Sequence, residues 1–583
     1  MRRMQGNLIS AFFLVAGVPA AWSFSPRTPF EPMEPASDGT VTAPLPPNAM
    51  PETALTGGTG PVPAERLNWH VPDPAIDRTK IQERLAKARK DNDKPTIQYI
   101  ERTLQRIEII HRDNQQRLTL QDCLRRTLAN SYAIEVQSFN PAVETTRVVE
   151  AESAFDAVFF AGVTKNKIDR PTGSTLASNN IDFVETQSGI RKVLPSGMTV
   201  SATYVFQRTD TALSFQQINP EYFNDLRLEM RQPLLRGFGL DYNLSAIRIA
   251  NLDRKTSDYA FARQVQDVLR NVEELYWRLV SARRDVVITA RLLADFETIN
   301  DYLVARQQFD ITPVQLSATK ANLEQSRAQF IQTLANVQDN EDRLIAAMND
   351  PELNLADDVE IVPVDFPPID RIVLDRLAEA QVALDNRQEI KEQELRVESA
   401  RILVGRAKNE ELPQLDFTFR YTIDGLGSNA DSAFDQLTMV RFEEYLIGVQ
   451  FEVPIGNRGP RAAAQRARLQ HQQAVAQLQS VLEQVLLDVN EAVRRMSTRY
   501  DQIGPSFESA EAREREVESI VARAERKDLN TLNTELGARQ NLAQSRRAML
   551  LAMVDYHLAI VDLERAKGTL LQYNNVLIPI DED

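Results

Sequence analysis

Two very long stretches of the chain carry apolar side chains at the spacing of an α-helix. They run from Asn243 to Phe309 and from Pro460 to Lys527. As helices each would be about 100 Å long, which is too long for an ordinary globular core. Gly504-Pro505 lies inside the second stretch, and its proline lacks the N–H that a helix needs. We therefore expect two long rods, the second with a kink or break at Pro505.

The segment after each long stretch predicts a helix with neighbours on two sides. Each carries one seven-residue seam of large apolar side chains and a second seam of mostly small ones. A two-stranded coiled coil needs only one seam, so helices of this kind pack on both flanks and close into a cylinder. The large seams are Leu316, Leu323, Phe330, Val337, Leu344 and Leu542, Met549, Tyr556, Leu563; the second seams are Val314, Ala321, Ala328, Ala335 and Ala538, Ser545, Ala552, Ala559, Ala566.

Shorter segments between the helices alternate apolar and polar side chains, as strands do. A soluble antiparallel sheet with one wet face would show the same pattern. Charge on one face, aromatic side chains on the other and a length near the ~9–11 residues that cross an outer membrane favour membrane strands. The clearest case has Leu415, Phe417, Phe419, Tyr421 and Ile423 against Asp416, Thr418, Arg420, Thr422 and Asp424.

The chain is a duplication of one unit. Similar segments recur at offsets of 256 and 257 residues early in the unit and of 221 and 219 residues late in it, so the first copy holds 36 extra residues. These predict an additional hairpin with its turn at Leu194–Gly197, and hence four strands in the first copy and two in the second. Six strands are fewer than the ~8 of the smallest barrel, and open edges are not tolerated in lipid. The chain must therefore oligomerise to close a barrel.

Composition places the protein in a cell envelope and excludes some functions. Arg2 and Arg3 followed by an apolar run from Leu8 to Ala21 predict a secretory signal peptide. The net charge of −15 and the isoelectric point near 5.1 argue against a nucleic-acid partner. Cys123 is alone, so it forms no intramolecular disulfide and is predicted to be buried on a helix face.

The sequence offers no catalytic or metal-binding constellation. The four histidines are far apart and lack metal-ligand spacing, and Gly237-Phe238-Gly239 lacks the further glycines and the lysine of a phosphate loop. We therefore predict no catalytic residue, no metal site, no cofactor and no enzymatic activity. The histidines are His70, His111, His471 and His557.

From about Leu118 to Tyr573 the chain resembles the TolC-like outer-membrane efflux proteins. The most specific segments are Leu118–Asp122, Gln232–Gly239 and Val453–Arg458. The resemblance implies an α+β membrane protein in which duplicated long α-helical hairpins form a periplasmic tunnel and the strands join a shared trimeric outer-membrane β-barrel. It also implies an outer-membrane channel, a passive export conduit for small molecules or proteins. Its partners would be two further copies of the chain, a periplasmic adaptor, an inner-membrane efflux pump and outer-membrane lipid.

The resemblance and the pattern together divide the chain into six parts. These are a signal peptide (1–23), a Pro-rich leader with an N-terminal helical extension (24–115), a first repeat with helices, barrel strands and a helical hairpin (116–350), an equatorial linker (351–375), a second repeat (376–571) and a C-terminal tail (572–583).

The resemblance also assigns roles to particular turns. The turns between paired long helices match the periplasmic entrance, where an adaptor docks: Asp310, Ile311, Thr312, Asp528, Leu529, Asn530 and Thr531. Thr534 and Gly537 stand where the best-studied members have paired aspartates, so Asp310, Asp528 and Glu535 become the candidates for charge at the entrance constriction, a solvated turn surface being an equal alternative. The barrel-exit turns match Pro233, Gly237, Pro454 and Gly456.

Two alternatives stay open at this level. A periplasmic adaptor or coiled-coil scaffold would use the helices without entering lipid. Within the channel interpretation, three chains would give 18 strands if the extra hairpin joins the barrel, or 12 if it does not. The exported compound, the class of pump, the role of the N-terminal extension and the charge preference of the entrance are not indicated by the sequence.

Overall fold

The computed structural model describes residues 85–90, 94–108, 114–171, 173, 178–213, 216–306, 312–354, 359–367, 369–523 and 529–578. All of them fall in the larger of the two units into which the chain divides, Leu45–Asp583. The predicted signal peptide and leader lie outside the described residues.

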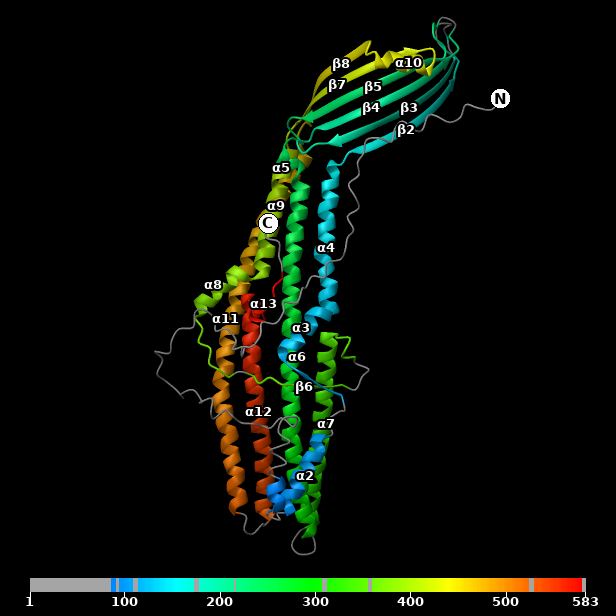
Figure 1. The fold of residues 1–583 in the computed structure, drawn as a ribbon. Helices are drawn as coiled ribbons and strands as arrows, with labels where there is room; N and C mark the ends of the chain where they lie inside the picture. The colour runs from blue at the N-terminus through cyan, green and yellow to red at the C-terminus, as the bar shows by residue number, and fades with distance from the viewer. Residues whose placement is uncertain are drawn as a thin grey trace, which may run out of the picture. The chain divides into compact units, whose positions relative to one another are not determined.

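The order of helices and strands repeats, as the duplication predicts (Figure 1). The first set has α3 (Leu120–Asn130), α4 (Tyr132–Glu152), β2 (Val158–Asp169), β3 (Asn180–Val193), β4 (Thr199–Thr211), β5 (Glu221–Pro233), α5 (Leu240–Asn243), α6 (Ser245–Ala305) and α7 (Pro313–Met348). The second has α8 (Arg376–Asn386), α9 (Gln388–Glu410), β7 (Gln414–Gly427), α10 (Ala430–Thr438), β8 (Phe442–Glu452), α11 (Arg458–Arg523), α12 (Leu529–Lys567) and α13 (Leu570–Tyr573). The predicted division into four strands and two is confirmed.

Both long rods are present, and one detail of the prediction is wrong. α6 has 61 residues and α11 has 66. Of the kink or break expected at Gly504-Pro505, the break does not occur: α11 runs through Pro505 without interruption. Phe507 and Ala510, just beyond the proline, pack with Met549 and Met553 of α12. Burial of this apolar cluster offsets the one backbone hydrogen bond that proline removes.

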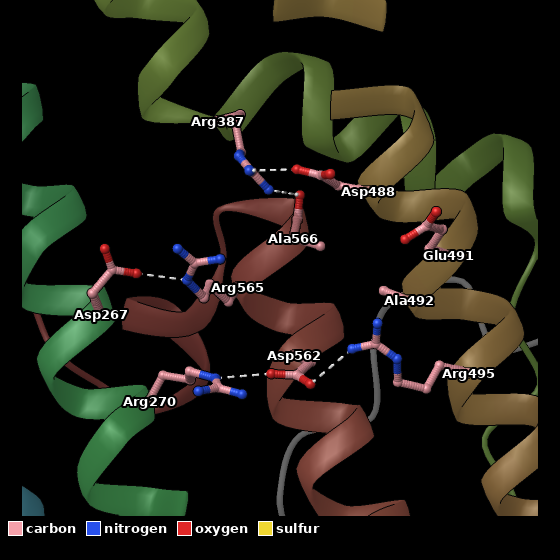
Figure 2. A pocket seen from close by; sticks show the side chains of 10 residues that line it. All are labelled: Asp267, Arg270, Arg387, Asp488, Glu491, Ala492, Arg495, Asp562, Arg565 and Ala566. Carbon is pink, nitrogen blue, oxygen red and sulfur yellow. Dashed lines mark hydrogen bonds and ion pairs between the residues drawn. The ribbon is translucent and has the colours of Figure 1, made fainter. Parts of the chain in front are cut away.

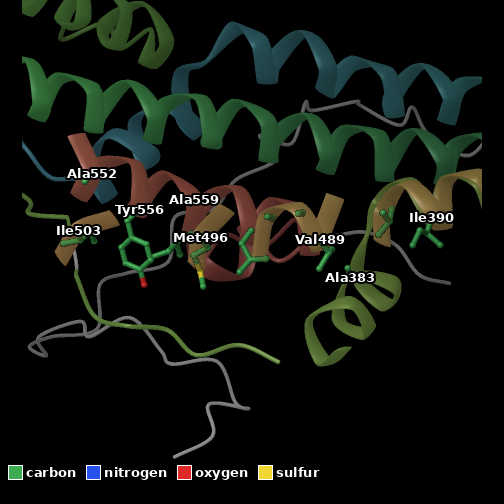
Figure 3. Packing of buried hydrophobic residues seen from close by; sticks show 13 residues of the cluster. Ala383, Ile390, Val489, Met496, Ile503, Ala552, Tyr556 and Ala559 are labelled. Atoms are coloured by element: carbon green, nitrogen blue, oxygen red, sulfur yellow. The ribbon is translucent and has the colours of Figure 1, made fainter. Parts of the chain in front are cut away.

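α12 is buried on both sides, whereas α7 is buried on one. Both seven-residue seams of α12 are buried except at the half-buried Ser545, because this helix packs against α6 and against α11. The large seam of α7 is also buried from Leu323 to Leu344, but Val314, Ala321 and Ala328 of its second seam are exposed. A buried apolar cluster joins α8, α9, α11 and α12 around Tyr556 and Met496 (Figure 3).

The six strands after α4 and α9 form one antiparallel sheet in the order β2-β3-β4-β5-β7-β8. The extra hairpin is therefore part of the sheet, between β2 and β5. Its turn is at the predicted residues, with Gly197 at a φ of +88° and the Leu194 N–H donating to Met198 O at 2.7 Å. Within this sheet β2 and β8 are edge strands, each paired on one side only.

A second, small sheet ties the N-terminal part of the first repeat to the linker between repeats. β1 (Asn114–Leu118) pairs in parallel with β6 (Val359–Pro363). Arg283 of α6 lies beneath β6, where it donates to Glu360 at 2.6 Å, to Glu341 of α7 at 3.3 Å and to the Ile361 carbonyl at 3.1 Å. All three charged side chains are buried.

The N-terminal part of the described chain is helical, as predicted. Residues 85–90 are helical, and α2 (Lys94–Glu108) follows and packs on α6 (Figure 1). Cys123 is fully buried on α3, as expected, and burial raises the pKa of its thiol to about 12. Among the described helices, none combines the length and apolarity that a membrane span requires.

Candidate functional site

The register of the large sheet separates an apolar face from a polar face. The directly opposed pairs Leu228 with Tyr421, Met230 with Phe419, and Phe419 with Ile447 share the apolar face. Tyr445, Ile447, Val449 and Phe451 of β8 and Phe159 and Val163 of β2 are exposed large side chains on this face. The opposite face carries the strand arginines other than Arg208, and most of the carboxylates. Side-chain alternation therefore gives the sheet two chemically different sides.

Ion pairs between and along neighbouring strands cross the polar face. Arg231 of β5 pairs with Asp416 of β7 at 2.6 Å, and Arg420 of β7 pairs with Glu229 of β5 at 2.8 Å. On this face of the six strands, eight carboxylates outnumber four arginines, which leaves a net charge of −4 per chain. The charged residues of the face are Arg191, Arg227, Arg231 and Arg420 with Glu185, Glu221, Asp225, Glu229, Asp416, Asp424, Glu444 and Glu452.

The predicted exit turns lie where the sheet joins the long helices. Pro233 ends β5, and Gly237 and Gly456 have φ values of +85° and +92°, which side chains rarely allow. The Gly237 N–H donates to Asn409 Oδ1 of α9 at 2.7 Å, and the Asn243 side chain donates to the Gly237 carbonyl at 2.9 Å. These bonds fix the angle at which α6 leaves the sheet. Pro454 follows the end of β8 and is exposed.

The predicted entrance residues lie between the paired long helices, and three of them, Asp310, Ile311 and Asp528, fall outside the described residues. Thr312 is the residue before α7, and its N–H donates to the Gln315 side chain at 3.0 Å. Leu529 and Asn530 are the first two residues of α12, followed by Thr531. The C-terminal ends of α6 and α11 and the N-terminal ends of α7 and α12 lie at the same end of the helices (Figure 1).

The three constriction candidates on α12 have different surroundings. Thr534 and Gly537 are exposed, and open space surrounds the position of a Cβ at Gly537. Glu535 is instead only 3% exposed, and it forms an ion-pair triad with Arg539 and Asp295. Arg539 donates to Glu535 at 2.7 Å and to Asp295 of α6 at 2.5 Å. Arg539 therefore joins α12 to α6 within one chain, and Glu535 contacts it from the same helix.

The two carboxylates of this triad keep the guanidinium group of Arg539 charged. Burial by itself would lower the pKa of Arg539. The attraction of Asp295 and Glu535 outweighs burial and raises this pKa, so the guanidinium stays protonated. Burial raises the pKa of Asp295 above its ordinary value. The sequence shows that Glu535 and Arg539 are one helical turn apart. It does not show the contact of Arg539 with Asp295, which is 244 positions away. Farther along the same helix pair Arg547 bonds Asp285 and donates to Thr289 at 2.7 Å.

A polar cavity of about 460 Å³ lies between α6, α9, α11 and α12 (Figure 2). Asp562 of α12 accepts from Arg270 of α6 at 2.9 Å and from Arg495 of α11 at 3.2 Å. Arg565 of α12 bonds Asp267 of α6 at 2.6 Å. The lining has four arginines and four carboxylates, so the charges balance and the cavity links the two repeats rather than presenting a charged binding site. The arginines are Arg270, Arg387, Arg495 and Arg565; the carboxylates are Asp267, Asp488, Glu491 and Asp562.

The described residues contain no group of three or more His, Cys, Asp or Glu arranged to hold a metal ion. His557 is packed in the interior against Trp277, with ring centroids 4.4 Å apart, and burial lowers the pKa of its imidazole to about 4. His70 and His111 lie outside the described residues.

Comparisons with known proteins agree on one kind of protein. Residues 380–569 match the family model described as outer membrane efflux protein. The structure is similar to the outer membrane channel CmeC of Campylobacter jejuni, with 17% identity, a TM-score of 0.55 and coverage of 80% of this chain and 87% of that chain. It is also similar to the outer membrane protein VceC of Vibrio cholerae, with 16% identity, a TM-score of 0.57 and coverage of 77% and 96%.

A third similar structure is the open state of the MtrE outer membrane channel of Neisseria gonorrhoeae, with 15% identity, a TM-score of 0.54 and coverage of 77% and 89%. At these identities the structural likeness establishes the α+β fold. A comparison with curated protein sequences finds no match.

Proposed function

We propose that this chain, a member of the outer membrane efflux protein family, is the outer-membrane channel of an efflux system. The family match covers most of the second repeat, and the fold is that of outer membrane channels. The chain would act as a passive conduit, with no catalytic residue and no cofactor of its own. Energy for export would come from an inner-membrane pump.

The observation that carries this proposal is the two-faced sheet with two open edges. An apolar face suits lipid, and a charged face suits a water-filled lumen. Strands in lipid must have no free edge, because each unpaired backbone group there costs several kcal/mol. β2 and β8 each lack a partner on one side within the sheet, so closure requires another chain. We infer a trimer in which β8 of one protomer pairs with β2 of the next.

The helices support the same assembly. The exposed second seam of α7 needs a neighbour, and so does α4, where Tyr132, Val136, Phe139 and Val143 form an exposed apolar stripe at helical spacing. In a trimer these stripes would face adjacent protomers and close a periplasmic tunnel. The turns after Ala305 and Arg523 would then form its entrance, where a periplasmic adaptor docks.

Because the extra hairpin lies inside the sheet, three chains would give 18 strands rather than 12. Barrels of this strand number leave an aqueous channel. The test is to purify the protein from the outer-membrane fraction, to look for heat-modifiable migration on a gel, and to count strands by electron cryomicroscopy. We expect a trimer with 18 strands. A stable, soluble monomer in the periplasm would refute the channel and favour the adaptor or scaffold interpretation.

A physiological test complements the structural one. Deleting the gene from its host should raise sensitivity to at least one compound in a panel of toxic small molecules, and the wild-type gene should restore resistance. Reconstituted protein should form water-filled pores in planar lipid bilayers. A purified trimer that conducts no ions would contradict the conduit.

A further inference from the structure

We propose that α10 is an interfacial helix that lies against the outer leaflet of the membrane, where Phe434 and Met439 contact lipid and hold the helix on the sheet. The inference rests on the proposed function, because the apolar face of the sheet is what places the lipid. It identifies a lipid contact that neither the pore nor the closure of the trimer requires.

α10 packs on the apolar face of the sheet, over β7 and β5. Gly425 and Gly427 of β7 alternate in phase with Tyr421, so side chains at these positions would point to this face. Atoms of α10 occupy that space, since a Cβ at Gly427 would lie 2.5 Å from the backbone nitrogen of Ala433. Asn224 of β5 is directly opposite Gly425 and is fully buried. A helix of the chain itself therefore covers part of the face that the proposed function assigns to lipid.

α10 runs back along β7, from the outer end of the strand toward the middle of the sheet. Ser432, near the start of the helix, lies over Gly427, and Leu437, near its end, lies over Gly425. The Ser432 N–H donates to the Asn429 side chain at 2.8 Å and fixes the start of the helix. The C-terminal end of α10 is therefore nearer than its start to the large apolar side chains of β7.

The side chains of α10 differ around the helix. Ala433 faces the sheet and is buried. At about 100° per residue, Asp431 and Asp435 lie about 160° and 200° from Ala433, on the outward side, and both are exposed. Phe434, on the flank of the helix, is 50% exposed, and Met439, at its C-terminal end, is 73% exposed. Separate apolar and charged sides suit a helix that lies at a membrane interface.

Aromatic side chains lie beside α10 on the same face of the sheet. Phe206 of β4 and Tyr222 of β5 have ring centroids 6.1 Å apart. Tyr222 is directly opposite Gly427, so β7 has a glycine where its neighbours have aromatic rings. Aromatic side chains form girdles at the two interfaces of membrane barrels. α10 brings Phe434 to the part of this girdle that β7 leaves without a ring.

Lipid is the occupant that this position favours, because the exposed side chains of α10 continue the apolar face of the sheet. The long helices extend from the opposite end of the strands, so α10 lies at the end of the sheet that faces the outer leaflet (Figure 1). The carboxylates of Asp431 and Asp435 limit its depth, since a charged side chain is costly in hydrocarbon. The helix therefore lies at the level of the headgroups, with Phe434 and Met439 against the acyl chains.

The first experiment measures what surrounds α10, on the full-length trimer in vesicles of phosphatidylethanolamine and phosphatidylglycerol. Spin labels are attached at Phe434→Cys and Met439→Cys in a Cys123→Ala background. Tyr445→Cys, on the apolar face, is the lipid reference, and Glu444→Cys, on the polar face, is the water reference. Oxygen dissolves in the bilayer and a nickel chelate stays in water, so the ratio of their collision rates with a label measures its contact with lipid.

We expect this ratio at positions 434 and 439 to be at least threefold above that at position 444. A ratio at both positions equal to that at 444 would overturn the inference, because α10 would then lie in water. A ratio at position 445 equal to that at 444 would instead count against the proposed function, since the apolar face of the sheet would not meet lipid.

The second experiment tests whether lipid holds the helix on the sheet. Phe434→Ser/Met439→Ser changes two exposed side chains and leaves the buried side of α10 intact. We expect amide hydrogen exchange of residues 430–438 in vesicles to quicken at least fivefold. Leu446→Ser is the matched control, because Leu446 is also exposed but lies on the polar face, and it should leave the exchange unchanged. Unchanged exchange in the double variant would overturn the anchoring by lipid, because packing on β7 and β5 would then be sufficient.

Discussion

Removing Arg539 is expected to release the link between the two helical hairpins near the proposed entrance. Arg539 is ten residues from the start of α12 and Asp295 is ten residues from the end of α6, so the triad lies about 15 Å from both turns. In Arg539→Met, the carboxylates of Asp295 and Glu535 lose their shared cation. Their side chains are 14% and 4% exposed, so little solvent replaces it.

The expected cost is about 3 kcal/mol, the lower end of the range for breaking a buried ion pair. If the entrance opens by separating α6 from α12, the triad exists only in the closed state. Its loss then raises the ratio of open to closed channels by up to about 100-fold, at about 1.4 kcal/mol per factor of ten. Single-channel recording in planar bilayers measures this ratio, and thermal denaturation of the trimer measures stability in parallel.

The neutral triple variant Asp295→Asn/Glu535→Gln/Arg539→Met is the matched control. It removes the link without leaving buried charge, so we expect open channels with stability near that of the wild type. A lower melting temperature in Arg539→Met with an unchanged open fraction would refute the reasoning, because the triad would then serve the fold alone.

Three further outcomes follow from particular residues. Burial raises the pKa of Glu273 to about 7, so between pH 4.5 and 7 the native state holds a proton that the unfolded chain has released. The free energy of unfolding should therefore fall by up to about 3 kcal/mol as the pH rises from 4.5 to 7, and stay level above pH 7. Melting temperatures measured over this pH range should show the fall in the wild type and not in Glu273→Gln. Gly425→Val should displace α10 and lower trimer stability, because a Cβ there would lie 2.2 Å from a carbonyl of α10, whereas Gly448→Val, with 3.6 Å of room, should not. Asp424→Asn/Glu444→Gln should reduce the preference for K⁺ over Cl⁻ in bilayer reversal potentials at about 0.1 M salt, and an equal preference in wild type and variant would count against a lumenal role for this face.

The sequence predicted those features that depend on periodic patterns. Strand alternation identified the two faces of β7, and the falling offset between copies located the extra hairpin with its turn at Gly197. Seven-residue seams identified the buried side of α12. In each case the interaction repeats along one element, so a single chain segment carries the whole signal.

The sequence could not reveal contacts that join distant segments through single side chains. Glu535 looked like an exposed charge at a turn, but it is buried because Arg539, which also pairs with Asp295, neutralises it. The break expected at Pro505 failed for a similar reason, since packing against Met549 and Met553 is invisible to local propensity. The roles predicted for the turn residues from Asp310 to Thr312 and from Asp528 to Thr531 stay predictions.

The two unpaired margins of the sheet also bear on how the protein must be made. A newly exported copy exposes the unpaired backbone edges of β2 and β8 together with the aromatic side chains of Phe159 and Tyr445. Unpaired edge strands of this kind can pair with any other extended chain, which leads to aggregation. Assembly must therefore keep each newly exported chain covered, or unfolded, until two further chains are available. The yield of trimer should depend steeply on the rate of synthesis.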